Sequence, residues 1–310
     1  MRHVGLLLKH VGDATENPRD EVTSTAGISD DEIIEYLGDG QSRVQEVVLR
    51  DLPHFAGWDT YYEQDIVAAT QEYSISPGDA FYLGSVREVR YSPTGVARDF
   101  RPLAFLEARE TGDFDLTYIS AYSLRGGEII VDGVPGSSSG SLRSYYVRRL
   151  DKLDKRRGKI ASVAGAAPYT TITLEDDTDL DETNIALYDY LCVNSAQGVV
   201  TYYNAPYVSY DTSTKVLTFD SGVTSSVGTI AVGSYITLGK YTTTHSKLPD
   251  ECEKYLMAYA KWKIFKRDSS DDAIEQNAEL VAMEDAFLTA FNNNVLDLRN
   301  QLVSEPEWFF

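Results

Sequence analysis

Residues 248–267 read LPDECEKYLMAYAKWKIFKR, and this stretch decides how the rest of the chain is interpreted. Pro249 lies near the first helical position, and the acids Asp250 and Glu251 follow it, which is typical of a helix N-terminus. Apolar side chains then recur at helical spacing on one face, at Tyr255, Ala258, Tyr259, Trp262 and Phe265. The stretch therefore predicts an amphipathic helix near the end of the sequence.

Two further helices are expected. One follows a cap at Ser269 or Ser270, and the other covers residues 29–49, starting at a Ser29–Glu32 capping box. Gly38 and Gly40 are expected to kink or split the N-terminal helix. The apolar stripe of the last helix is close to a heptad rhythm and consists of Ile274, Ala278, Val281, Leu288, Phe291, Val295 and Leu298. No such helix buries its apolar face alone, so the helices are expected to pack together as one bundle.

Between the helices the apolar pattern changes to every second residue, which indicates strands. The first strand region covers 81–90, 102–109, 127–131 and 145–150. The second covers 170–174, 190–194, 198–203, 215–219 and 229–238, and its spacing suggests a small barrel or sandwich. The predicted fold class is α+β, with a helical bundle from the N- and C-terminal helices, a β-rich region and an inserted all-β domain. The predicted domains are residues 1–153 plus 247–310 as the core and residues 154–246 as the insertion.

The composition limits the classes of function that the chain can have. Hydrophobic residues make up 43% of the chain, which is ample for a packed core. The 28 basic and 48 acidic residues give a net charge of -20, so the basic surplus of a tight DNA binder is missing. An acidic lining would suit a channel through which DNA slides, and ordinary solubility explains the charge equally well. Two distant cysteines fit a reducing cytoplasm, and no apolar run reaches membrane length.

The sequence contains no pattern that indicates a catalytic, cofactor or metal site. The four histidines lack metal-ligand spacing and are expected to be surface or packing residues: His3, His10, His54 and His245. Cys192 lies in an apolar strand and is expected to fill the core. The acidic run 176–182 fails the EF-hand pattern, and the GSSSG at 136–140 matches a hydrolase elbow by letters only. We therefore expect a protein that is not an enzyme and holds no cofactor.

Two segments are candidate contact sites. A basic cluster stands out from the acidic background and consists of Arg148, Arg149, Lys152, Lys155, Arg156, Arg157 and Lys159. It is either a solvated linker or a contact to an acidic neighbouring subunit or to passing DNA. The aromatic residues Trp308, Phe309 and Phe310 either fold back onto their own helices or anchor into a groove on a partner.

The order of these features resembles a known family. The residues that carry the resemblance are DEIIEYL at 31–37, YIS at 118–120, GEIIV at 127–131, YYVRRL at 145–150, LPDE at 248–251 and YLMAYA at 255–260. This order is similar to that of the head-to-tail adaptor proteins of tailed bacteriophages, also called head completion or connector proteins. The resemblance covers roughly residues 1–150 and 246–310, and the β insertion is similar to one in some larger members.

The resemblance implies a structural virion protein of the neck or tail, assembled in the host bacterial cytoplasm. Its copies are expected to form a ring, twelve-fold in this family, which binds the portal protein on one side and tail or nozzle proteins on the other. DNA is expected to pass through the channel without specific binding, and no membrane is involved. The residues expected to contact the portal or a neighbouring subunit are Arg148, Arg149, Arg156, Arg157, Trp308, Phe309 and Phe310.

Two other classes of function stay open. The 21 tyrosines far exceed the 11 phenylalanines, so the Tyr-rich insertion could be a carbohydrate- or receptor-binding β module of a phage tail. That reading leaves the terminal helices unexplained. An enzyme acting on a cell-wall polymer would need a carboxylate pair whose geometry a sequence does not give.

Overall fold

A computed structural model describes residues 3–14, 28–53, 55–75, 81–107, 119–133, 140–164, 168–175, 180, 185–223, 229–267 and 272–303. The chain divides into two compact units. Unit 1 comprises Met1–His54 and Leu150–Phe310, and unit 2 comprises Phe55–Arg149. The fold is mixed α+β, as predicted. The division differs from the predicted domains because it groups the barrel with the helices and sets the strands of unit 2 apart.

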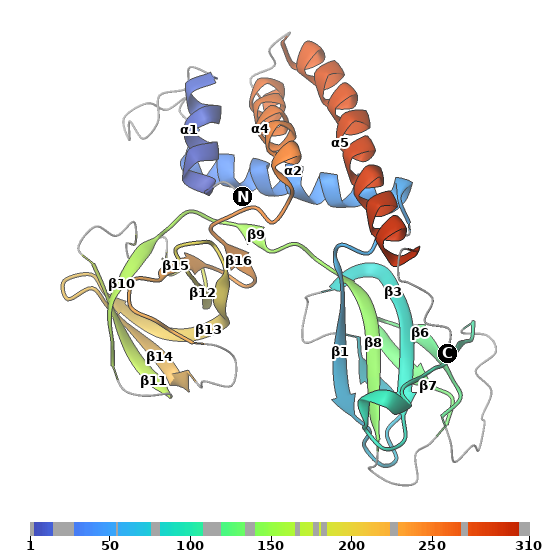
Figure 1. Cartoon of the computed structure of the whole chain (residues 1–310). Helices are drawn as coiled ribbons and strands as arrows, with labels where there is room; N and C mark the ends of the chain where they lie inside the picture. Colours follow the sequence, from blue (N-terminus) through green and yellow to red (C-terminus); the bar gives the residue numbers. More distant parts are fainter. Residues whose placement is uncertain are drawn as a thin grey trace. The chain divides into compact units, whose positions relative to one another are not determined.

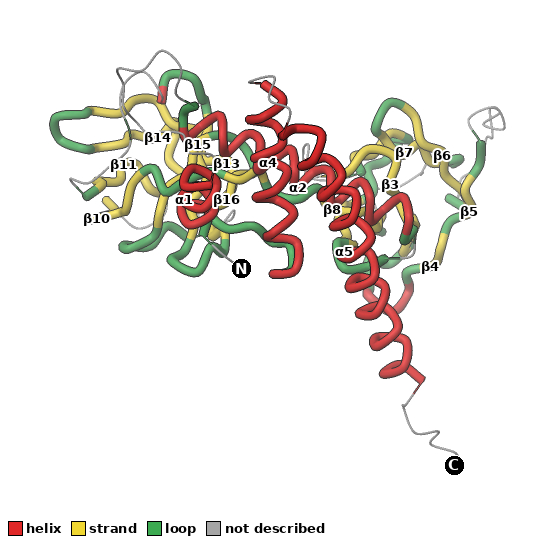
Figure 2. Tube along the Cα trace, turned by 90° about the horizontal axis from the view of Figure 1, so that it is seen from above, coloured by secondary structure: helices red, strands yellow, loops and turns green. Residues whose placement is uncertain are grey.

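The helices of unit 1 come from both ends of the chain. They are α1 (Val4–Ala14), α2 (Asp30–Asp51), α4 (Glu253–Arg267) and α5 (Asp272–Val303), and a short 3-10 turn at Asp250–Cys252 precedes α4. Helix α4 lies between α1 and α5, and α2 runs across and contacts all three (Figure 1). The same order of α1, α4 and α5 is seen from above in Figure 2. The predicted start of the α4 segment at Pro249 is confirmed, since Pro249 caps the 3-10 turn.

Helix α2 begins where the capping box predicts. The Ser29 hydroxyl accepts a hydrogen bond from the Glu32 amide at 3.2 Å, which satisfies one free N–H of the first turn. The predicted split at the two glycines is wrong, because α2 is continuous from Asp30 to Asp51. At Gly40, a Cβ would lie 3.2 Å from the Cβ of Tyr259 in α4, whereas at Gly38 it would meet nothing. Gly40 therefore allows α2 and α4 to approach closely, which a sequence pattern does not distinguish from a kink.

The two glycines of α2 provide a matched pair for a stability test. Gly38→Ala should raise the free energy of unfolding by about 0.5–1 kcal/mol, because alanine restricts the unfolded chain and has the higher helix propensity. Gly40→Ala should lose this gain, since its methyl group would press on Tyr259. Urea unfolding of both variants measures the difference. Equal gains would contradict the close approach of α2 and α4.

The buried faces of α4 and α5 differ from the predicted stripes. In α4, Leu256 and Ile264 are buried, while Trp262 and Phe265 are half-buried. Among the side chains of α5 that are described, the fully buried apolar ones are Leu280, Phe287 and Phe291. The predicted stripe is wrong in its first half, where the described side chains are exposed: Ile274, Ala278 and Val281. Heptad spacing identified an apolar face of α5, but the helix packs inside the chain with another face.

A six-stranded closed barrel forms the β part of unit 1. Its strands are β10 (Gly158–Ala164), β11 (Tyr169–Leu174), β12 (Tyr190–Asn194), β13 (Val200–Asp211), β14 (Val216–Val223) and β15 (Tyr235–Leu238). They are antiparallel in the order β10-β11-β14-β13-β12-β15, and β15 closes the barrel on β10. Inward residues such as Ile160, Leu191 and Ile236 are fully buried in one core. The observed strand β15 is shorter than the predicted strand at 229–238, because it begins at Tyr235.

Strand β10 was missed in the sequence because the basic cluster before it looked like a linker. The end of this cluster instead enters the barrel, since Lys159 pairs with Tyr235. Before it, β9 (Lys152–Leu153) pairs in parallel with β16 (Thr242–Thr243), the segment that follows the barrel. The barrel is thus closed off at its base by a two-stranded link to the helices.

Unit 2 contains two four-stranded sheets. Sheet β1-β8-β3-β4 consists of β1 (Asp59–Asp65), β8 (Ser141–Arg148), β3 (Phe81–Ser92) and β4 (Arg101–Pro102). Sheet β2-β7-β6-β5 consists of β2 (Glu72–Ser74), β7 (Glu128–Val131), β6 (Ala121–Arg125) and β5 (Ala104–Phe105). Both sheets contribute to one core, for example with Val89 and Ile129. The predicted strand at 102–109 is wrong in part, because it is split between the two sheets.

Candidate functional site

The outer face of α5 carries large apolar side chains that are exposed. Ile274 is 77% exposed and Val281 is 58% exposed, and the exposed Ala278 lies between them. Their spacing of four and three residues puts them in one line along the helix. Asp285 continues the same line and is also exposed. We call these four residues the α5 stripe; nothing in the described part of the chain covers its large apolar members.

Another face of α5 is held firmly against α4. The Tyr255 hydroxyl donates a hydrogen bond to Glu284 Oε1 at 2.8 Å, and Arg43 of α2 binds the same oxygen at 3.1 Å. The ring of Phe287 meets that of Tyr255 edge to face, with centroids 5.2 Å apart. Burial and the carboxylate of Glu284 raise the pKa of Tyr255 well above its usual range. These contacts fix the rotation of α5, so the α5 stripe points away from the other helices.

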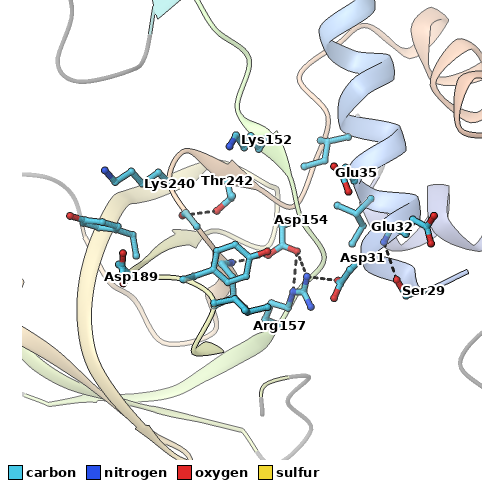
Figure 3. A pocket seen from close by; sticks show the side chains of 17 residues that line it. Ser29, Asp31, Glu32, Glu35, Lys152, Asp154, Arg157, Asp189, Lys240 and Thr242 are labelled. Carbon is cyan, nitrogen blue, oxygen red and sulfur yellow. Dashed lines mark hydrogen bonds and ion pairs between the residues drawn. The ribbon is translucent and has the colours of Figure 1, made fainter. Parts of the chain in front are cut away.

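Arg157, from the predicted basic cluster, is a buried structural residue. Its guanidinium binds Asp154 Oδ1 at 3.0 Å through Nε and 2.8 Å through Nη2. It also binds Asp31 Oδ1, at the N-terminus of α2, at 2.5 Å. Figure 3 shows this guanidinium between the two carboxylates. Arg157 thus joins the barrel to α2, and its side chain is 5% exposed.

A groove lies beside this ion-pair network. It has a volume of about 840 Å³ and lies between the first turns of α2 and the barrel. Figure 3 shows Glu32 and Glu35 on the helix side, with Asp189 and Lys240 on the barrel side. The lining mixes both signs of charge, and no pair of groups in it forms a recognisable catalytic arrangement. We assign the groove no chemistry.

Arg156 belongs to a second, separate cluster with two histidines. Its guanidinium lies over the Tyr235 ring at 4.0 Å and donates to the Ala196 carbonyl at 3.0 Å. The rings of His3 and His245 meet edge to face, with centroids 5.2 Å apart. The Gly5 amide donates to His3 Nδ1 at 2.9 Å, so His3 supports the first turn of α1. This cluster attaches α1 to the end of the barrel segment.

The two histidines predict a loss of stability in mild acid. Burial, the charge of Arg156 and the neighbouring His245 lower the pKa of His3 from 6.5 to about 4. The pKa of His245 is lowered mainly by burial and by Arg156. Because the folded state binds these protons more weakly than the unfolded state, their contribution is full above pH 6.5 and falls as the pH drops toward about 4. The protection factors of the α1 amides, which correct the exchange rates for their intrinsic pH dependence, should fall over this window.

A matched pair of variants tests this acid response. His3→Asn keeps an acceptor for the Gly5 amide but does not titrate, so it should flatten the pH dependence of α1 exchange. His10→Asn changes an exposed histidine on the same helix and should leave the dependence as it is. An unaltered dependence in His3→Asn would show that other groups cause the response.

Of the other predicted contact residues, Arg148 and Arg149 belong to unit 2. Arg148 ends β8 of unit 2 and is half-buried, and Arg149 follows it and is exposed. Within unit 1, Arg157 is internal and Arg156 stacks on the barrel, so these two arginines do not form one exposed patch. Trp308, Phe309 and Phe310 lie outside the described residues, as do the proposed caps Ser269 and Ser270.

The described residues contain no group of three or more His, Cys, Asp and Glu side chains placed to hold a metal ion. Cys192 is fully buried in β12, which confirms the prediction that it fills the core. Cys252 is also buried, and burial raises the pKa of its thiol to about 12. Of the helices in the described part, none has the length and apolar character needed to cross a bilayer. No protein-family model matches the chain, and the comparison with curated proteins gives no match either.

Proposed function

We propose that the chain is a structural ring subunit of the neck of a tailed bacteriophage, joining the portal protein to the tail. It works by assembly and not by catalysis. The observation that carries this proposal is the α5 stripe, an exposed apolar line on a helix whose other face is fixed by internal packing. Exposed apolar surface of this kind marks a protein–protein contact. In a permanent ring, a neighbouring subunit would cover the α5 stripe.

The arrangement of the chain agrees with this role. Helices from both ends of the sequence pack together in unit 1, as expected for a bundle at the centre of an adaptor ring. The barrel would be the β domain that projects from the bundle. Copies in a ring would surround the DNA channel, bind the portal on one side and bind tail or nozzle proteins on the other. The net charge of -20 would let DNA slide without sticking.

Assembly with a portal protein tests this function directly. Purified protein is measured by mass photometry and negative-stain imaging, alone and with the portal protein from the same source. We expect rings with a central channel that are promoted by the portal. A monomer that ignores the portal at every concentration tested would refute the adaptor role.

One observation favours a second candidate, a carbohydrate- or receptor-binding module. On sheet β1-β8-β3-β4 of unit 2, the Arg143 guanidinium lies over Tyr61 at 4.6 Å and over Phe100 at 4.0 Å. Tyr61 is 54% exposed, and such aromatic faces can stack on sugar rings or anchor a protein partner. Binding to a glycan array that is lost in Tyr61→Ala would support this candidate, and absence of glycan binding would remove it.

A further inference from the structure

The row of helices α1, α4 and α5 in unit 1 has two unlike outer edges. Helix α4 is in the middle and contacts α1 on one side and α5 on the other (Figures 1 and 2). The α5 stripe marks one edge. At the other edge, Leu6 of α1 is 50% exposed, although its neighbours Leu7 and Leu8 are buried. Each edge thus presents apolar surface away from α4.

The two edges carry opposite charge. Leu6 is flanked on the same face of α1 by Lys9 and His10, three and four residues later, and both are exposed. The α5 stripe instead contains Asp285, and the exposed Glu275 lies next to its first member. We call Leu6, Lys9 and His10 the α1 edge. An apolar centre with basic flanks therefore faces outward on one side, and an apolar centre with acidic flanks on the other.

We propose that the α5 stripe of one copy docks on the α1 edge of a second copy of this chain. The docking continues the row of helices from one copy to the next and buries Leu6 against Ile274 and Val281. The basic flank of Lys9 and His10 then faces the acidic flank of the α5 stripe in the other copy, whereas like edges would bring equal charges together. This inference rests on the proposed function, because it names the partner of the α5 stripe.

Docking of two unlike edges has a consequence for symmetry. A contact between identical patches ends at a dimer, but a contact between different patches leaves one free edge of each kind on every assembly. Further copies add in the same way, and the row closes into a ring when the rotation from one copy to the next closes. A single kind of contact between unlike edges is therefore compatible with a ring of many copies.

Disulfide trapping between two singly substituted proteins tests the docking. Leu6→Cys is made in one full-length chain and Val281→Cys in another, tagged chain, and the mixture is oxidised with the portal protein present. Both native cysteines are buried, so they should not react. We expect a mixed cross-linked dimer from this pair and much less from a control mixture of Leu6→Cys with Val208→Cys. Val208 lies on barrel strand β13 and is 62% exposed, close to the exposure of Val281.

Equal cross-linking of the two mixtures, or none in either, overturns the inference. If rings nevertheless form, the adaptor role stands and another surface joins the subunits; if no rings form, the adaptor role fails with it. As a second measurement, Val281→Glu should weaken self-association by about tenfold or more, because it puts a charge into an apolar contact. Val208→Glu should leave it unchanged. An identical effect of the two substitutions would also overturn the proposal.

Discussion

Asp154→Ala should lower the free energy of unfolding of unit 1 by about 3–5 kcal/mol, because it leaves the Arg157 charge buried without its main partner. Asp154 lies at the base of the barrel and is 4% exposed. Its carboxylate accepts two hydrogen bonds from Arg157, one from the Leu238 amide and one from the Lys155 amide. Burial raises the pKa of Asp154, and these bonds act against that rise. Their loss would open the barrel base at β15.

The control for this change is a partner carboxylate that water reaches. Asp31 binds the same guanidinium, but its side chain is 55% exposed, so Asp31→Ala should cost no more than about 1 kcal/mol. The double variant Asp154→Leu with Arg157→Met removes both buried charges and should recover much of the lost stability. Urea unfolding measures the free energy of unfolding of the three variants, and hydrogen exchange of the β15 amides shows whether the barrel base has opened. If Asp154→Ala and Asp31→Ala cost the same, the network does not hold the barrel base.

Local chemistry in the sequence was sufficient to predict α2, α4 and several strands, whereas α1, β1, β2, β6 and β10 were not predicted. Ser29 and Glu32 fix the start of α2 because a capping box satisfies free N–H groups whatever the tertiary context. Alternating apolar residues likewise predict β12, whose bounds agree with the predicted 190–194. Strand β10 was not predicted because the residues leading into it are basic, and a run of charges is normally solvated. Arg157 becomes buried there because the neighbouring Asp154 and the distant Asp31 of α2 both bind its guanidinium.

The candidate interface on α5 could not be predicted from the sequence, because the spacing of apolar residues does not define which face the rest of the chain covers. Helix α5 has apolar residues on more than one face, and the sequence gives no measure of which face the rest of the chain covers. Tertiary contacts of Tyr255, Glu284 and Phe287 select the inner face, so the α5 stripe is left outside. The α1 edge is still harder to find, because a lone exposed leucine such as Leu6 is common on any surface.

Tyr255→Ala should lower the free energy of unfolding of the helices by about 3–5 kcal/mol, as expected for deleting a large buried aromatic side chain. Tyr255 is 2% exposed and fills the space between α4 and α5 against Phe287. The deletion leaves a cavity there and removes a hydrogen bond from Glu284, which keeps Arg43. Hydrogen exchange of α5 amides should accelerate more than that of the barrel, because the loss lies between the two helices.

Tyr255→Phe separates the hydrogen bond from the packing. The ring still fills the space, so the loss should be about 1.5–3 kcal/mol, the usual contribution of a bond to a charged group. Because these contacts set the rotation of α5, Tyr255→Ala should also reduce ring assembly, whereas Tyr255→Phe should assemble like the unchanged protein. The contrary result is that Tyr255→Ala forms rings at a temperature where the α5 amides of its monomer exchange freely. That result would mean that contacts between subunits order α5. The α5 stripe would then be shaped by the neighbouring copy and not by Tyr255.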